Sequence, residues 1–74
     1  MSHLPSLRAR DIIRRLEDLG FVPLRQKGSH IFFKHPDGRT TVVSAHAGEA
    51  IGRRLMSKIL SDIKLSPEQF FGLE

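Results

Sequence analysis

The chain contains no cysteine, which excludes disulfide bonds and thiolate metal sites. It has no apolar run close to the roughly 18 residues of a membrane-spanning helix, and no signal-peptide pattern. The sequence also lacks a Walker loop, a dinucleotide-binding motif, and histidines or carboxylates with metal-ligand spacing. We therefore expect a cytoplasmic protein with no cofactor, metal site or membrane partner. If it is an enzyme, acid–base chemistry without a metal is the simplest form.

The length and charge of the chain indicate one small basic domain over residues 1–74. Lysine and arginine number 12 and aspartate and glutamate 8, for a net charge of +4. This balance favours an anionic partner, with nucleic acid first. At the ends of the chain, we expect residues 1–5 to be flexible. We expect Leu73-Glu74 to be an added dipeptide of the kind that precedes a purification tag.

The first predicted element is an amphipathic helix over residues 8–19. Its apolar side chains follow the spacing of one helical stripe, at Ile12, Ile13, Leu16 and Leu19. Gly20 can end this helix in the left-handed conformation, and Phe21 can then fold back on Leu16.

Three strands are predicted next, over residues 21–27, 29–35 and 39–45. Pro23 lacks an N–H, so the first of these strands should lie at a sheet edge or carry a bulge. Two glycine-containing turns separate the strands, at Lys27-Gly28 and at residues 35–38.

The chain should end in two more helices. Residues 51–63 repeat a helical apolar stripe, although Gly52 moves the expected start towards Arg53. Residues 66–69 form a capping box that begins a short terminal helix, with Phe70 or Phe71 packed on the core. The predicted fold is α+β, in the order α-β-β-β-α, with helices on one face of a three-stranded antiparallel sheet. This layout resembles that of double-stranded-RNA-binding domains.

His30 is the leading candidate for chemistry. In an extended strand it shares a face with Phe32 and Lys34, while Ile31 and Phe33 share the other face with His35. Both faces carry aromatic rings, so the pattern does not decide which is buried. On an open face, the imidazole can act as a general acid or base near neutral pH. The alternative is a half-buried histidine that bonds a backbone group at the hairpin.

The second turn predicts the register around His30. If residue 35 pairs with residue 39, His30 lies opposite Ser44, and His46 becomes its diagonal neighbour. Two imidazoles could then divide the acid and base roles around one phosphodiester. The alternative for His46 is a loop residue that orders residues 46–50.

Cationic side chains gather at the first turn and on both helices. Lys27, Gly28 and Ser29 offer a charge, an approachable backbone and a hydroxyl, which are groups that contact phosphates. An ordinary solvated hairpin is the alternative interpretation. The candidate RNA-binding residues are Lys27, Gly28, Ser29, Lys34, His46, Arg53 and Arg54. Other charges can extend the footprint or keep a helix surface wet, namely Arg8, Arg10, Arg14, Arg15 and Lys58.

Several stretches of the chain resemble the HicA family of toxin–antitoxin systems. The matching parts are "LEDLGF", "RQKGSHIFFKHPDGR", "VVSAH", "KIL" and "SPEQF", which together span about residues 4–71. The run "QKGSH…HPDG" is the most specific, because it joins a glycine turn, a histidine and a second turn at fixed spacing.

The resemblance implies a small ribonuclease toxin with a double-stranded-RNA-binding-domain-like fold. Such a toxin would cleave mRNA without a metal, through the histidine after Gly-Ser, and would inhibit translation and growth. In this chain that histidine is His30. Its partner would be a HicB-type antitoxin that covers the active face. Two competing hypotheses are a non-catalytic double-stranded-RNA-binding module and a domain that only binds another protein.

Overall fold

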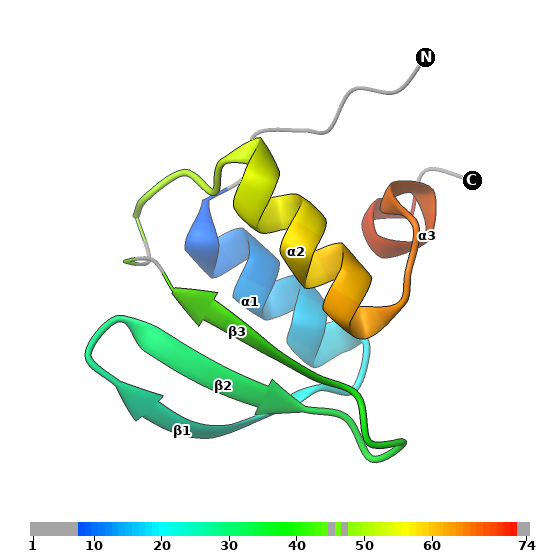
Figure 1. Cartoon of the computed structure of the whole chain (residues 1–74), viewed down its shortest axis with the longest axis horizontal. Helices are drawn as coiled ribbons and strands as arrows, with labels where there is room; N and C mark the ends of the chain where they lie inside the picture. Colours follow the sequence, from blue (N-terminus) through cyan, green and yellow to red (C-terminus); the bar gives the residue numbers. More distant parts are fainter. Residues whose placement is uncertain (1–7, 45, 47, 73–74) are drawn as a thin grey trace.

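The structure, a computed structural model, describes residues 8–44, 46 and 48–72. The expectations for residues 1–5 and for Leu73-Glu74 lie outside these residues. The element order is α-β-β-β-α with a short final helix, as predicted (Figure 1). The elements are α1 (Ala9–Asp18), β1 (Val22–Lys27), β2 (His30–Lys34), β3 (Thr40–Ser44), α2 (Arg53–Ile63) and α3 (Pro67–Phe71).

The three strands form one antiparallel sheet in the order β1-β2-β3. Figure 1 shows α1 and α2 side by side at the β3 end of the sheet, with β1 farthest from them. The core contains buried side chains from both helices, from the sheet and from α3, including Leu16, Ile59, Phe33 and Phe70. All residues of β1 are exposed, so this strand is held by pairing rather than by burial.

The end of α1 has the backbone pattern that its sequence predicts. Gly20 has a φ of 100°, in the left-handed region. Its N–H donates to the carbonyl of Glu17 at 3.0 Å, and the N–H of Phe21 donates to the carbonyl of Leu16 at 2.9 Å. These two bonds define a Schellman ending, and they bring the buried Phe21 back against the helix.

The first hairpin differs from the prediction by one residue. Lys27 pairs with His30, so the two turn residues are Gly28 and Ser29 rather than Lys27 and Gly28. Gly28 has a φ of 60°, which fits the first central position of a type II′ turn. Ser29 therefore lies in the turn, and β2 begins at His30.

Two other expectations for the sheet are confirmed. The pairing of β1 with β2 shifts between Pro23 and Arg25, and β1 is an edge strand, as its proline indicated. In the second hairpin, the N–H of His35 donates to the carbonyl of Arg39 at 2.8 Å. His30 lies opposite Ser44, which is the predicted register.

The last two helices begin where the sequence indicated. The first residue of α2 is Arg53, with Gly52 as its N-cap. At α3, the Ser66 N–H donates to the Gln69 side chain at 2.9 Å, and the Gln69 N–H donates to the Ser66 hydroxyl at 3.1 Å. This reciprocal capping box places Phe70 in the core.

Candidate active site

The structure decides which face of β2 is open. Phe33 is only 1 % exposed and Ile31 packs against the core, so these two side chains face the helices. His30, Phe32 and Lys34 therefore lie on the opposite side of the sheet, which we call the open face. His30 itself is exposed. This exposure contradicts the alternative of a half-buried histidine.

The nearest cross-strand neighbours of His30 come from both flanking strands. Lys27 lies opposite it on β1 and Ser44 lies opposite it on β3. The Cβ atoms of such directly opposed pairs are about 4.5–5.5 Å apart. Within residues 8–44, 46 and 48–72, the structure records no hydrogen bond to the His30 ring. The residues opposite His30 on the two flanking strands are thus a lysine and a serine, which share its side of the sheet.

The turn before His30 has an open backbone. A Cβ built on Gly28 would meet no other atom within 4 Å, so the glycine is needed for its positive φ and not for lack of space. A phosphate can therefore approach the turn backbone. Ser29, the second turn residue, is half-buried.

Lys34 shares the open face with His30 but lies at the other end of β2. Four residues of extended chain separate the two Cα atoms by roughly 13 Å. Lys34 pairs with Val22 and Thr40. Lys34 is therefore too far from His30 for the two side chains to act on the same group.

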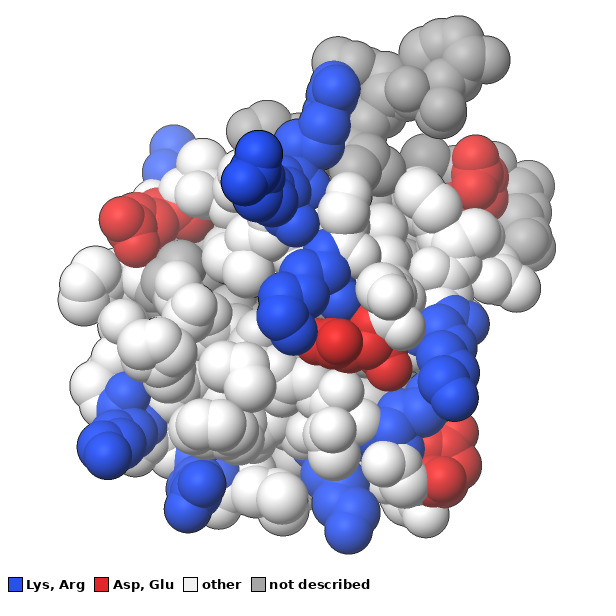
Figure 2. All heavy atoms as spheres, viewed as in Figure 1, with Lys and Arg blue, Asp and Glu red and all other residues white. Residues whose placement is uncertain are grey.

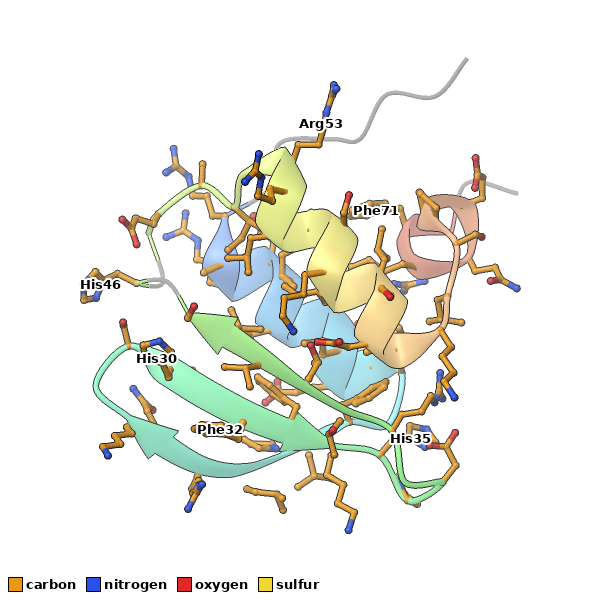
Figure 3. All side chains as sticks on the ribbon, in the orientation of Figure 1. His30, Phe32, His35, His46, Arg53 and Phe71 are labelled. Atoms are coloured by element: carbon orange, nitrogen blue, oxygen red, sulfur yellow. The ribbon has the colours of Figure 1, made fainter. Side chains whose placement is uncertain are left out.

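His46 lies on the loop that follows β3, and its backbone is bound to Glu49. The N–H of His46 donates to the Glu49 carboxylate, and the N–H of Glu49 donates to the His46 carbonyl, both at 2.9 Å. Figure 3 shows the His46 ring pointing outward from this loop. These contacts favour the alternative in which His46 orders the loop.

The helix arginines are not gathered around His30. Arg53 and Arg54 are exposed in the first turn of α2, and Figure 3 shows Arg53 pointing away from the sheet. Arg15 is half-buried, and its Nε donates to the carbonyl of Phe70, so it fastens α3 to α1. Of the basic residues considered from the sequence, Lys27 is the direct cross-strand partner of His30.

Sequence reasoning did not single out two further residues of the open face, Arg25 and Phe32. The Arg25 guanidinium lies over the Phe32 ring, 4.8 Å from its centroid. Beside them is a hollow of about 620 Å³, which Leu24 and Val42 also line, and which extends to Lys58 and Asp62 of α2. The available signal was the strand period, because Phe32 is two residues after His30.

Positive charge dominates the strands. Lys27, Arg25 and Lys34 belong to β1 and β2, and no aspartate or glutamate occurs in the three strands. Figure 2 shows lysine and arginine side chains along the lower margin of the molecule, over the strands. The open face is therefore suited to a polyanion.

The second hairpin, residues 30–44, contains one acidic residue, Asp37, whose carboxylate is hydrogen-bonded within the turn. The Arg39 N–H donates to the Asp37 carboxylate at 3.0 Å, and the Arg39 Nε donates to it at 2.8 Å. The backbone hydrogen bond is the largest cause that lowers the pKa of Asp37, and the Arg39 side chain adds to it. Asp37 therefore orders the turn.

Two further properties concern the described part of the chain. No group of three histidine or acidic side chains there is arranged to hold a metal ion. No helix there is long and apolar enough to cross a membrane.

Comparison with known proteins gives one match. The model of the family described as the HicA toxin of bacterial toxin–antitoxin systems matches residues 9–65, which is more than half of the chain. A search of curated proteins found no match. The matched stretch contains both hairpin turns, the whole sheet and the exposed His30.

Proposed function

Because the chain belongs to the HicA family, the toxins of bacterial toxin–antitoxin systems, we propose that it is an endoribonuclease that cleaves mRNA. Cleavage would inhibit translation and growth. His30 is the catalytic residue in this proposal, and Lys27 with the turn at Gly28-Ser29 contacts the phosphate backbone. The observation that carries the proposal is an exposed histidine directly opposite a lysine, in a sheet whose three strands contain no aspartate or glutamate.

The chemistry proposed for His30 is proton transfer during internal attack by the RNA. The imidazole takes the proton of a ribose 2′-hydroxyl, and the 2′-oxygen forms a bond to the adjacent phosphorus. The bond from phosphorus to the 5′-oxygen breaks, and that oxygen takes a proton from water. The hydroxide that remains takes the proton from the His30 imidazolium, which returns the imidazole to its starting form. The products are a 2′,3′-cyclic phosphate and a 5′-hydroxyl end. The Lys27 ammonium stabilises the negative charge that develops on the phosphate oxygens.

The attacking group in this step comes from the RNA itself and His30 serves as the base, so the step as proposed requires no metal ion. The test is an RNA-cleavage assay with the partner-free protein in EDTA. Wild-type protein should cut RNA there, and the His30→Ala variant should not.

Lys27→Ala should weaken RNA binding and make it less dependent on salt. Each phosphate contact on a single strand contributes a slope of about −0.7 to the plot of log affinity against log salt. We expect the slope for the variant to be smaller in magnitude by about one such contact. Fluorescence anisotropy titrations at roughly 50 to 200 mM salt measure both slopes. Lys64→Ala is the matched control, because Lys64 is exposed at the end of α2 and outside the open face. Equal slopes for Lys27→Ala and wild type would argue against this contact.

A toxin of this family is kept inactive by an antitoxin, and we propose a HicB-type partner that covers the open face. The positive charge of this face fits a partner that brings acidic groups. The purified complex should not degrade RNA. Diethyl pyrocarbonate, which acylates exposed imidazoles, should modify His30 in the free protein and much less in the complex. Mass spectrometry of both samples gives the answer, and equal modification would contradict occlusion of His30.

A further inference from the structure

One aromatic side chain of this protein is not explained by the core. The sequence contains five phenylalanines. Three of them are fully buried and Phe71 packs against the same core, but Phe32 does not belong to this cluster. Phe32 is instead half-buried on the open face, in the same strand as His30. Figure 3 shows the two residues along β2, with His30 at the turn end.

The Phe32 ring and the Arg25 guanidinium suit a flat ligand that carries a phosphate group. Its cross-strand neighbours are Arg25 on β1 and Val42 on β3, and the Arg25 guanidinium lies over the ring. The adjoining hollow of about 620 Å³ falls within the range of small-molecule sites. The hollow borders Phe32 and not His30, and it continues to α2, where the Asp62 carboxylate accepts hydrogen bonds from Lys58 at 3.2 Å and from Thr41 at 3.0 Å. Phe32 and Arg25 therefore form its side nearest to His30 along β2.

We propose that Phe32 is a stacking platform for a nucleobase of single-stranded RNA, beside the phosphodiester that is cleaved at His30. The inference rests on the proposed function. Two residues of extended strand place the two side chains roughly 7 Å apart along β2. This distance is about the length of one extended nucleotide. A base on Phe32 therefore brings a neighbouring phosphodiester towards His30 and Lys27.

Arg25 has a defined role in this arrangement. A guanidinium and a nucleobase are both planar π systems, so the base takes the place of the guanidinium on the ring. The released guanidinium can then bind a phosphate oxygen with parallel N–H donors. Arg25 thus positions RNA in the complex and covers the ring when RNA is absent.

The same geometry distinguishes single-stranded from duplex RNA. In a duplex each base is paired and stacked on its neighbours, so its flat face cannot reach a ring that lies on a sheet. A duplex footprint would instead rely on phosphate contacts from helix residues such as Arg53 and Arg54. The stacking platform therefore assigns unpaired RNA as the substrate class.

The test measures RNA binding in a background that does not cleave. A short labelled RNA, single-stranded or annealed to its complement, is titrated with the His30→Ala protein and with variants that also change Phe32. Phe32→Leu should weaken binding of the single strand roughly 10-fold, which is the scale of one lost base stack. Phe32→Tyr keeps an aromatic face, so its affinity for the single strand should equal that of the His30→Ala parent. Val22→Ala, at an exposed apolar residue opposite Lys34 on the same face, should leave affinity unchanged.

Two outcomes would overturn the inference. One is equal affinity of Phe32→Leu and its parent for the single strand; if that variant also binds its antitoxin more weakly or melts at a lower temperature, Phe32 is a protein contact or a hairpin-stabilising residue. The other is binding of the duplex at least as tight as binding of the single strand. Because the assay measures binding, it gives a result even if the wild-type protein does not cleave RNA.

Discussion

Replacing His30 by alanine is expected to lower the rate of RNA cleavage by about 10²–10⁴-fold and to end growth arrest on induction of the chain. A positioned acid or base contributes on this scale, and the open face holds His30 where a phosphodiester can reach it. The fold should remain intact, because His30 is exposed on the side of the sheet away from the helices. We expect a loss of about 1 kcal/mol or less in unfolding free energy, and a melting temperature within a few degrees of wild type.

The matched control for this variant is His46→Ala. Its imidazole points outward from the loop, and its bonds to Glu49 are made by the backbone, so we expect only a minor loss of cleavage. The assay uses refolded, partner-free protein in EDTA, and end labelling should detect 5′-hydroxyl products. Cleavage retained by His30→Ala would refute the catalytic assignment. Activity that EDTA removes and a divalent ion restores would show a metal-dependent mechanism.

Replacing Phe33 by alanine is expected to remove about 3–5 kcal/mol from the unfolding free energy. The residue is 1 % exposed and lies between the sheet and the helices, so the truncated ring leaves a cavity. A chain of this length has a total stability of about 4–11 kcal/mol, so the variant should be largely or partly unfolded at 37 °C. Urea unfolding followed by circular dichroism measures the loss.

Phe32→Ala is the matched control for the Phe33 variant, since it removes the same ring from the neighbouring position on the opposite face. We expect a cost of about 1–2 kcal/mol, because the half-buried ring loses two cross-strand pairs, with Val42 and with Arg25, and the second of these is also a cation–π contact. Similar destabilisation by both variants would mean that the open face contributes to the core. The comparison separates the two functions of adjacent phenylalanines in β2.

Much of this fold follows from local chemistry that a sequence shows. The Gly20 ending of α1, the capping box at Ser66 and the start of α2 at Arg53 each depend on a few neighbouring residues. The second turn also determined the pairing of β2 with β3, because Pro36, Asp37 and Gly38 permit one turn geometry. These features were predictable because the residues that form each of them are within a few positions of one another in the sequence.

The first turn was predicted one residue early for a physical reason. A glycine fits the second central position of a type I′ turn and the first central position of a type II′ turn. The sequence around Gly28 allows both, and only pairing across the strands selects the second. The correction matters for the site, because it places Lys27 opposite His30.

Other parts of the site depend on distant segments. Alternation in β2 could not show whether Phe32 or Phe33 is buried, because both faces carry an aromatic ring. The apolar faces of α1 and α2 decide the matter by covering Phe33. The contact between Arg25 and Phe32 likewise requires the shifted pairing at the β1 bulge, which Pro23 suggested without fixing its position.

The two glycine turns at the ends of β2 restrict how the length of this strand can change. Gly28 and Gly38 each close a short turn, so the register of the residues between them is set from both ends. Because side chains alternate along a strand, the addition of one residue within β2 would move every following side chain of the strand to the opposite face of the sheet. The next apolar ring would then meet solvent, and a lysine would meet the helices. A second added residue would restore the original order. The segment between the two turns can therefore change in length only by an even number of residues if the same side chains are to stay buried.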